Sequence, residues 1–295
     1  MADTYAEDVI FHQPSFTKTW HTKSYAAISP SDPRLSAAGK VVLITGGGSG
    51  IGKATAKAFI EAQAAAILIV GRTEPKLKKT VAELQGIGKT TISYAVADAT
   101  DAAAVDAAFA TAIQDHGHID VVVSNAGHLD DHLPIAKSDL AEYWRSFEVN
   151  IKGPLIVSRA FLKVHRPGAT FINVSSAAAI MAAIPGFSSY SASKLGGAKV
   201  MEYLHFENPD LRVFNWQPAT TQTDMQSKAG VKMGAPDDIG LPASFAVWLT
   251  SQESEFLRGR LVWSNFDVEE MKARADEIKE KNLLTLSLTG YPFNA

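Results

Sequence analysis

The sequence predicts an α/β protein with a doubly wound, Rossmann-like sheet of seven mostly parallel strands and helices on both faces. Short apolar runs alternate with helical patterns through residues 39–265. The first run leads directly into a glycine-rich turn and then an alanine-rich helix. Because parallel strands need helical crossovers between them, this alternation favours a parallel sheet.

Each predicted strand is a short apolar run bounded by polar or turn residues. Residues 53–63 and the segments between later runs have helical patterns, one of them expected to be interrupted or bent near Gly153-Pro154. The predicted strands are Val41–Thr45, Ala66–Val70, Thr91–Val96, Ile119–Ser124, Ala169–Ser175, Arg212–Gln217 and Gly259–Ser264. The later helices are predicted at Glu74–Gly86, Asp101–Gly117, Leu140–Val164, Tyr190–His205, Pro242–Ser251 and Asp267–Lys281.

We divide the chain into an arm (1–38), a Rossmann-fold domain (39–265), and a C-terminal helix and tail packed on that domain (266–295). The arm carries Phe11, Phe16, Trp20 and Tyr25, too many aromatic rings for a solvated tail. It is expected to pack on the domain or on a neighbouring subunit, and less readily over the substrate cleft. Residues 224–242 lack clear periodicity and are rich in glycine and proline, as expected of a mobile substrate lid.

Composition excludes several classes of function. The net charge of the 295 residues is −3, which offers no field to attract nucleic acid or an anionic membrane. Because the chain has no cysteine, disulfides, thiolate catalysis and cysteine-based metal sites are excluded, and no metal is expected. The N-terminus does not resemble a secretory signal, and the apolar runs are too short to span a bilayer. We therefore expect a cytoplasmic protein with neither a nucleic-acid nor a membrane partner.

The glycine-rich turn GGGSGIG follows the first strand and opens the first helix, which is the context of a dinucleotide-binding loop. Glycines let backbone amides approach a pyrophosphate, and the helix N-terminus favours negative charge. A flexible turn is the alternative. The candidate cofactor-binding residues here are Gly46, Ser49, Gly50, Ile51 and Gly52.

Cofactor preference depends on the end of the second strand, where Gly71-Arg72-Thr73 carries no acidic residue. An acidic side chain there would bind the adenosine 2′-hydroxyl of NAD. Arg72 instead suits a 2′-phosphate, so NADP(H) is favoured and NAD(H) remains possible; a solvated surface arginine is the alternative. Asp98, just past the third strand, is a candidate acceptor for the adenine amino group or a helix cap.

Small and polar residues follow two later strands. Asn125, Ala126 and Gly127 close the fourth strand and would let a cofactor ring approach the backbone. The stretch ATTQTDM after the sixth strand supplies Thr221 and Thr223 as candidates for the nicotinamide amide or the phosphates. Threonine in a polar loop is otherwise an ordinary turn residue.

Tyr190 and Lys194 are the candidate catalytic pair. Four residues is about one helical turn, so the two side chains share a face. An ammonium beside a phenol lowers the phenol pKa from about 10, which allows proton exchange with an alcohol or ketone near neutral pH. Ser176, at the end of the fifth strand, would hold the substrate oxygen. A packed ring and a solvated amine are the alternative for the pair alone.

Asn150 lies inside a predicted helix, where asparagine is unfavourable. One interpretation is a buried amide that satisfies a backbone carbonyl. The other is a proton-relay residue that holds a water behind Lys194.

These motifs, in this order and at nearly these spacings, resemble the short-chain dehydrogenase/reductase family over residues 39–265. They are TGGGSGIG (45–52), NAG (125–127), the helical Asn150, Ser176 and YSASK (190–194). The arm and the C-terminal helix resemble additions found in fungal members that act on specialised metabolites.

The resemblance implies an NAD(P)-dependent enzyme acting on CH–OH groups. Tyr190 is implied as the general acid/base, Lys194 as the ligand of the nicotinamide ribose, Ser176 as the residue orienting the substrate, and Asn150 as part of a water relay. Two departures stand out. The serine-to-tyrosine segment is one residue longer than usual, so Ser175 competes with Ser176, and Pro218-Ala219 replaces the usual Pro-Gly.

The expected partner is a small alcohol or carbonyl substrate, and a homodimer or homotetramer is implied by the resemblance alone. Alternatives are a non-enzymatic dinucleotide sensor or scaffold, or a lyase or isomerase, because fold does not fix function. Residues 128–134 and 224–242 are expected to line the substrate pocket. Five apolar residues are assigned to either pocket or core: Met181, Ile184, Phe187, Met225 and Trp248.

Overall fold

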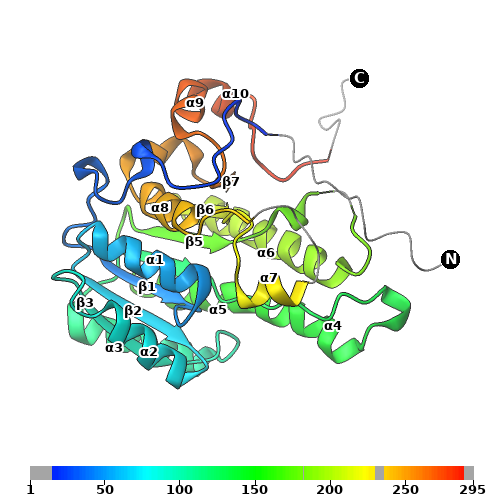
Figure 1. The fold of residues 1–295 in the computed structure, drawn as a ribbon, viewed down its shortest axis with the longest axis horizontal. Helices are drawn as coiled ribbons and strands as arrows, with labels where there is room; N and C mark the ends of the chain where they lie inside the picture. Colours follow the sequence, from blue (N-terminus) through cyan, green and yellow to red (C-terminus); the bar gives the residue numbers. More distant parts are fainter. Residues whose placement is uncertain (1–14, 182, 230–235, 289–295) are drawn as a thin grey trace.

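The computed structural model describes residues 15–181, 183–229 and 236–288. Their strands form one seven-stranded sheet in the order β3-β2-β1-β4-β5-β6-β7 (Figure 1). Every neighbouring pair is parallel, so the chain winds outward from β1 to β3 and then from β4 to β7, which confirms the predicted fold class. The strands are β1 (Val41–Thr45), β2 (Ala66–Gly71), β3 (Thr91–Val96), β4 (Val121–Ser124), β5 (Thr170–Val174), β6 (Arg212–Gln217) and β7 (Leu261–Trp263).

Helices cover both faces of the sheet. In β1, Val42 and Ile44 pack into one apolar cluster and Val41 and Leu43 into the other, as the two-residue period of a strand requires. The first cluster includes residues of α1 (Gly50–Glu61), α2 (Glu74–Leu84) and α8 (Gly240–Leu249). The second includes residues of α3 (Ala102–His116), α5 (Gly153–Leu162) and α6 (Ser188–Glu207).

The helix predicted over Leu140–Val164, with an interruption or bend near Gly153-Pro154, is interrupted in the structure. The structure divides it into α4 (Leu140–Phe147), a π-helical segment at Glu148–Lys152, and α5. The irregularity thus begins before the expected bend, and Pro154 stands in the first turn of α5, where its missing N–H costs no hydrogen bond. π-Bulges are frequent at functional sites, and this one contains Asn150.

Two other segments also differ from expectation. The predicted helix Asp267–Lys281 is two helices, α9 (Val268–Ala273) and α10 (Ala275–Glu280), separated at the non-helical Arg274. The Arg274 guanidinium lies over the Phe16 ring, 3.8 Å from its centroid, and donates a hydrogen bond to the Phe16 carbonyl. The first part of the predicted lid forms a short helix, α7 (Asp224–Ala229), whereas residues 230–235 lie outside the described residues.

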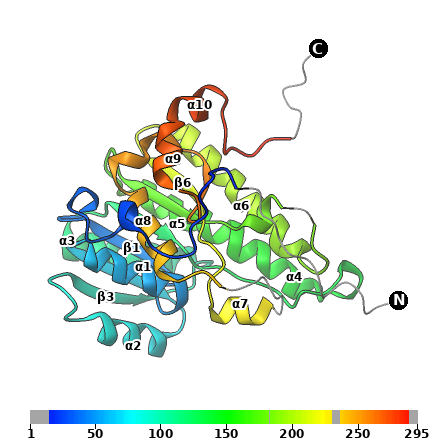
Figure 2. The same cartoon turned by 45° about the horizontal axis from the view of Figure 1, so that its top comes forward.

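The described part of the arm packs beside β7 and α9 (Figure 2). Trp20 forms a bridge with Phe266, and the Tyr25 hydroxyl donates to the Phe266 carbonyl. On the outer side of β7, the N–H of Leu261 donates to the Leu284 carbonyl of the tail. Arm and tail together therefore cover the last strand, whose unpaired backbone groups would otherwise invite pairing with another chain.

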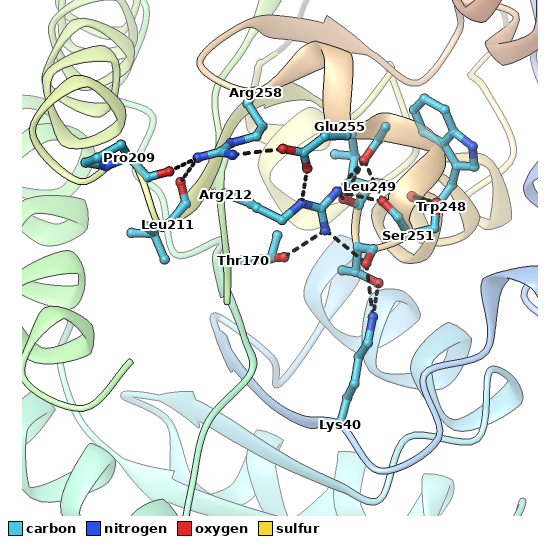
Figure 3. A network of polar contacts seen from close by, with 12 residues as sticks. Lys40, Thr170, Pro209, Leu211, Arg212, Trp248, Leu249, Ser251, Glu255 and Arg258 are labelled. Atoms are coloured by element: carbon cyan, nitrogen blue, oxygen red, sulfur yellow. Dashed lines mark hydrogen bonds and ion pairs between the residues drawn. The ribbon is translucent and has the colours of Figure 1, made fainter. Parts of the chain in front are cut away.

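A buried guanidinium joins the amino end of β6 to the end of α8 (Figure 3). Arg212 in β6 is 4% exposed and pairs with Glu255 at 2.9 Å. It also donates to the carbonyls that end α8, those of Leu249, Thr250 and Ser251. These carbonyls have no partner within the helix and carry partial negative charge, so the cation satisfies them and the helix dipole together.

We expect Arg212→Met to lower the free energy of unfolding by about 3–5 kcal/mol, because it removes the buried partner of Glu255 and one of the donors to each carbonyl at the end of α8. Urea unfolding at pH 7 measures this loss. Lys57→Met, which removes an exposed cation on α1, is the control and should change stability by less than about 0.5 kcal/mol. A loss below about 1 kcal/mol for Arg212→Met would show that the network contributes little.

Candidate active site

A cavity of about 480 Å³ opens at the carboxyl ends of the strands. Segments that follow six successive strands contribute to its wall, from Gly46 after β1 to Thr221 after β6. This is the position at which open parallel sheets bind ligands. The same cavity reaches the glycine turn, Ser176, Tyr190 and Lys194, which are far apart in the sequence.

The glycine turn has the shape of a phosphate cradle. Gly46 has a φ of +67°, and a Cβ on Gly52 would overlap the Gly46 carbonyl, so the turn packs tightly against the start of α1. Ser49 precedes α1 without capping it through its side chain, which leaves the helix N-terminus open to the cavity. Gly46, Ser49, Gly50 and Ile51 line the cavity, whereas the predicted cofactor residue Gly52 lies behind the turn and supports it.

Thr45 and Asn125 join the ends of the two central strands. The Thr45 hydroxyl accepts hydrogen bonds from the N–H groups of Asn125 and Ala126, both at 3.0 Å. In return, the Asn125 amide donates to the Thr45 and Gly46 carbonyls at 2.9 and 3.2 Å. Asn125, Ala126 and Gly127 line the cavity as predicted. Sequence reasoning missed Thr45 as a site residue, although its place before the glycine turn was the available signal.

Arg72 and Asp98 lie together at one end of the cavity, 3.7 Å apart. Asp98 also accepts from the backbone and hydroxyl of Thr100, and its other oxygen pairs with Arg145 at 3.2 Å. Burial favours a higher pKa for Asp98, but these hydrogen bonds and the two cations hold it below its usual range. Sequence reasoning missed Arg145, because nothing along the chain places α4 beside Asp98.

Two further charges and two threonines line the cavity near α7. Lys76 of α2 and Asp224 of α7 form an ion pair at 3.2 Å, which sequence reasoning did not predict. The Thr221 hydroxyl is buried and has no hydrogen-bond partner within the described part of the chain. Thr223 lines the cavity beside Gly50. A buried unpaired hydroxyl in a cavity wall is consistent with a ligand that supplies the missing partner.

Ser176 and Tyr190 meet at the other end of the cavity. The Ser176 hydroxyl hydrogen-bonds the Tyr190 phenol and accepts from the N–H of Ala178 at 3.2 Å. Ser175 also lines the cavity, but its hydroxyl is buried without a hydrogen-bond partner in the described residues. The contact with Tyr190 therefore favours Ser176 over Ser175 as the residue that faces the substrate oxygen.

Lys194 lies one turn from Tyr190 and is 6% exposed. Its ammonium is 5.8 Å from the Tyr190 ring centroid and donates to the Val174 carbonyl at 2.8 Å. Burial lowers the pKa of Lys194 to about 8. Burial also raises the pKa of Tyr190, against the opposing hydrogen bond from Ser176. The expected lowering of the phenol pKa by Lys194 is thus not present in the protein alone.

The Asn150 side chain connects three parts of the site. Its oxygen accepts from the N–H of His128, and its amide donates to the His128 carbonyl, both at 2.9 Å. The second amide proton reaches the Ser193 hydroxyl at 3.0 Å. The amide thus satisfies a backbone carbonyl, and both of its protons are engaged; the water relay stays a prediction.

The end of the cavity beside Tyr190 is apolar. Of the five residues assigned to pocket or core, four line the cavity and the fifth, Trp248, is fully buried in the core. Leu129 adds to this wall from the predicted pocket loop 128–134, and Met225 adds to it from the predicted lid. The four that line the cavity are Met181, Ile184, Phe187 and Met225.

The cavity fits a nicotinamide dinucleotide. The open helix N-terminus suits the pyrophosphate, Arg72 suits a phosphate on the adenosine ribose, and the buried Thr221 hydroxyl offers an unused partner. Fold and cavity together are those of a Rossmann-like α/β protein of the class that binds a nucleotide cofactor at the carboxyl ends of its strands.

Comparison with known proteins identifies the family. Residues 40–233 match the family model described as short chain dehydrogenase. The chain is 35% identical over 283 residues to the short chain dehydrogenase/reductase AacuD of Aspergillus aculeatus, covering 92% of this chain and 96% of that one. A short chain dehydrogenase/reductase of Claviceps purpurea is 34% identical, with 93% and 94% covered. The chain belongs to the short-chain dehydrogenase/reductase family, as its motifs predict, and these relatives are fungal.

Solved structures agree. A short-chain type dehydrogenase/reductase from Mycobacterium ulcerans superposes with a TM-score of 0.72 at 26% identity, covering 77% of this chain and 89% of that one. A dehydrogenase/reductase from Sinorhizobium meliloti superposes with a TM-score of 0.71 at 25% identity, covering 81% and 97%. The protein is therefore an oxidoreductase of this family that acts on CH–OH groups, and the family generally binds NAD(P)(H).

No helix among the described residues has the length and apolarity to cross a membrane. These residues also contain no group of three or more His, Asp or Glu side chains placed to hold a metal ion.

We expect Lys194→Met to stabilise the protein at pH 7 by on the order of 1–3 kcal/mol, because it removes a buried ammonium. The folded-state pKa of Lys194 is about 8, below its ordinary 10.5, so the unfolded chain holds more protons between these values. Wild-type stability therefore rises with pH across that window, and the advantage of the variant shrinks.

Urea unfolding at pH 7 and pH 10 measures both effects, with the exposed Lys89→Met as the control. A stability difference between Lys194→Met and wild type that is the same at both pH values would contradict the shifted pKa.

Proposed function

We propose that the protein is an NADP(H)-dependent oxidoreductase that interconverts a secondary alcohol and a ketone. The observation that carries this proposal is the meeting of Ser176, Tyr190 and Lys194 in the same cavity as the glycine turn. Bound nicotinamide supplies or accepts the hydride. The chain's own residues bind, orient and move the proton.

Tyr190 acts as the general acid/base in this proposal. Because burial raises its pKa, the phenol is protonated at neutral pH and is ready to donate to a carbonyl oxygen. Ser176 already contacts the phenol, so a substrate oxygen placed between the two hydroxyls would meet both. In the alcohol-oxidising direction the phenol must lose its proton first, and a cation brought close to it would assist.

Lys194 binds ribose hydroxyls in this proposal. An ammonium has three donors, and the Val174 carbonyl takes one of them. The side chain lines the cavity, which leaves donors for a ligand there. Asn150 supports the arrangement by connecting His128 to Ser193, one residue before Lys194.

The preference for NADP(H) rests on Arg72. Its side chain is 63% exposed and lines the cavity after β2, where Gly71 and Thr73 add no acid. The 3.7 Å contact with Asp98 is long enough for the guanidinium to turn toward a phosphate while Arg145 keeps its own contact with that carboxylate. NAD(H) use, a homodimer or homotetramer, and a cytoplasmic location stay predictions.

Tyr190→Phe should lower kcat for carbonyl reduction at least about 100-fold, since it removes the proton donor without emptying the cavity. Steady-state kinetics with NADPH across a panel of neutral ketones measures the loss, and fluorescence titration checks that NADPH still binds. Tyr203→Phe, at an exposed position on the same helix, is the control and should retain full turnover. Turnover within about threefold of wild type would refute the acid/base role, and NADPH binding without any turnover in wild type would favour a sensor.

Arg72→Ala should weaken NADPH binding about 10- to 100-fold, the value of one charge-assisted hydrogen-bonded contact, and change NADH binding less than about twofold. Fluorescence titration of each cofactor measures both constants. Lys79→Ala removes a more exposed cation from α2 and controls for the general loss of positive charge. Equal losses for NADPH and NADH would show that Arg72 does not recognise the phosphate.

A further inference from the structure

The helix that carries Tyr190 lacks a cap of its own. α6 begins at Ser188, and the preceding residue, Phe187, makes no side-chain capping hydrogen bond. Tyr190 is only the third residue of the helix, within the turn that frays most readily. The position of its phenol therefore depends on contacts that other segments make with this turn.

A buried carboxylate provides one such contact. Asp130 lies in the loop after β4 and is 4% exposed. It accepts a hydrogen bond from the Ser189 hydroxyl at 2.5 Å. Ser189 is fully buried and directly precedes Tyr190. The N-terminus of α6 also carries partial positive charge, which favours an anionic side chain beside it. Asp130 thus holds the first turn of α6 through the Ser189 hydroxyl.

The neighbours of Asp130 dock on the same turn. The His132 ring stacks on the Phe187 ring with centroids 4.2 Å apart and planes 19° apart. Gly186 has a φ of +84° and lies against the His132 carbonyl so closely that a Cβ would overlap it. Leu129 and Phe187 form a small apolar cluster with Tyr190. Residues 128–132 and 186–190 therefore form one packed unit.

The same loop is anchored at its other end by Asn150, which binds both backbone groups of His128. Asn150 also binds Ser193, and the Ser193 hydroxyl donates to the Tyr190 carbonyl at 2.8 Å. Two polar contacts thus hold α6 to the loop, one on each side of Tyr190. The Asn150 contact belongs to the motif described above; the Asp130 contact is additional.

We propose that Asp130 is a positioning residue whose bond to Ser189 fixes residues 184–190, so that the Tyr190 phenol faces Ser176 and Phe187 keeps its place in the substrate wall. Asp130 does not line the cavity, so it acts through Ser189. Small displacements of reacting groups cost up to 100-fold in rate, which sets the scale of the effect. Its effect on turnover rests on the function proposed above.

The kinetic test compares Asp130→Ala, Ser189→Ala and the double variant. Each single variant should lower kcat about 10- to 100-fold and raise KM for a neutral ketone, while the NADPH dissociation constant changes less than about threefold. Because both substitutions break the same bond, the double variant should be no slower than the slower single variant. Asp130→Asn keeps an acceptor for Ser189 and should retain more activity than Asp130→Ala. Asp115→Asn, which changes an exposed aspartate of α3 away from the cavity, is the control and should change kcat less than about twofold.

Amide hydrogen exchange gives a readout that needs no turnover. Asp130→Ala and Ser189→Ala should speed exchange at residues 186–191 at least about tenfold, and Asp115→Asn should not. The proposal is overturned if exchange at these residues stays at the wild-type rate, or if the losses of kcat multiply in the double variant. A parallel loss of NADPH affinity would also overturn it. Full turnover by Tyr190→Phe would refute the proposed function instead, and exchange at 186–191 would still decide the role of Asp130.

Discussion

Burial of the sheet on both faces is the constraint from which the rest of this structure follows. Strands such as β1 place alternate side chains in two apolar clusters, so a polar group within the sheet needs a partner there, as Asn173 and Asn215 have in each other. At the carboxyl ends, side chains and open backbone amides surround a cavity. At the amino ends, Arg212 closes the gap between β6 and the end of α8.

Buried polar groups at the two ends of the strands differ in whether they have hydrogen-bond partners. The Arg212 guanidinium has an acid, carbonyls and hydroxyls around it, as expected of a cation that serves stability. At the carboxyl ends of the strands, the Lys194 ammonium donates to the Val174 carbonyl. The hydroxyls of Ser175 and Thr221 there have no hydrogen-bond partner among the described residues. Unsatisfied buried groups cost stability, and two such hydroxyls in the wall of one cavity are consistent with a site that binds a ligand.

The acid/base chemistry of the site depends on what enters the cavity. In the protein alone, desolvation dominates: it raises the pKa of Tyr190 and lowers that of Lys194, so it disfavours the charged form of each group. The pairing of phenol and ammonium in the sequence motif therefore does not by itself produce a phenolate. The positions of Ser176 and Tyr190 are also important, because proton transfer requires the donor within hydrogen-bond reach of the substrate oxygen.

Local sequence determined the strands, the glycine turn and the family motifs, because each depends on residues close together in the chain: apolar runs predict buried strands, and four-residue spacing predicts a shared helical face. Only the tertiary structure decided which serine contacts Tyr190, where the helix around Asn150 becomes π-helical, and that Arg145 reaches Asp98. The same is true of Asp130 and Ser189, which are 59 positions apart. Such contacts join elements through the packing of the whole sheet, and no periodicity or motif along the chain encodes them.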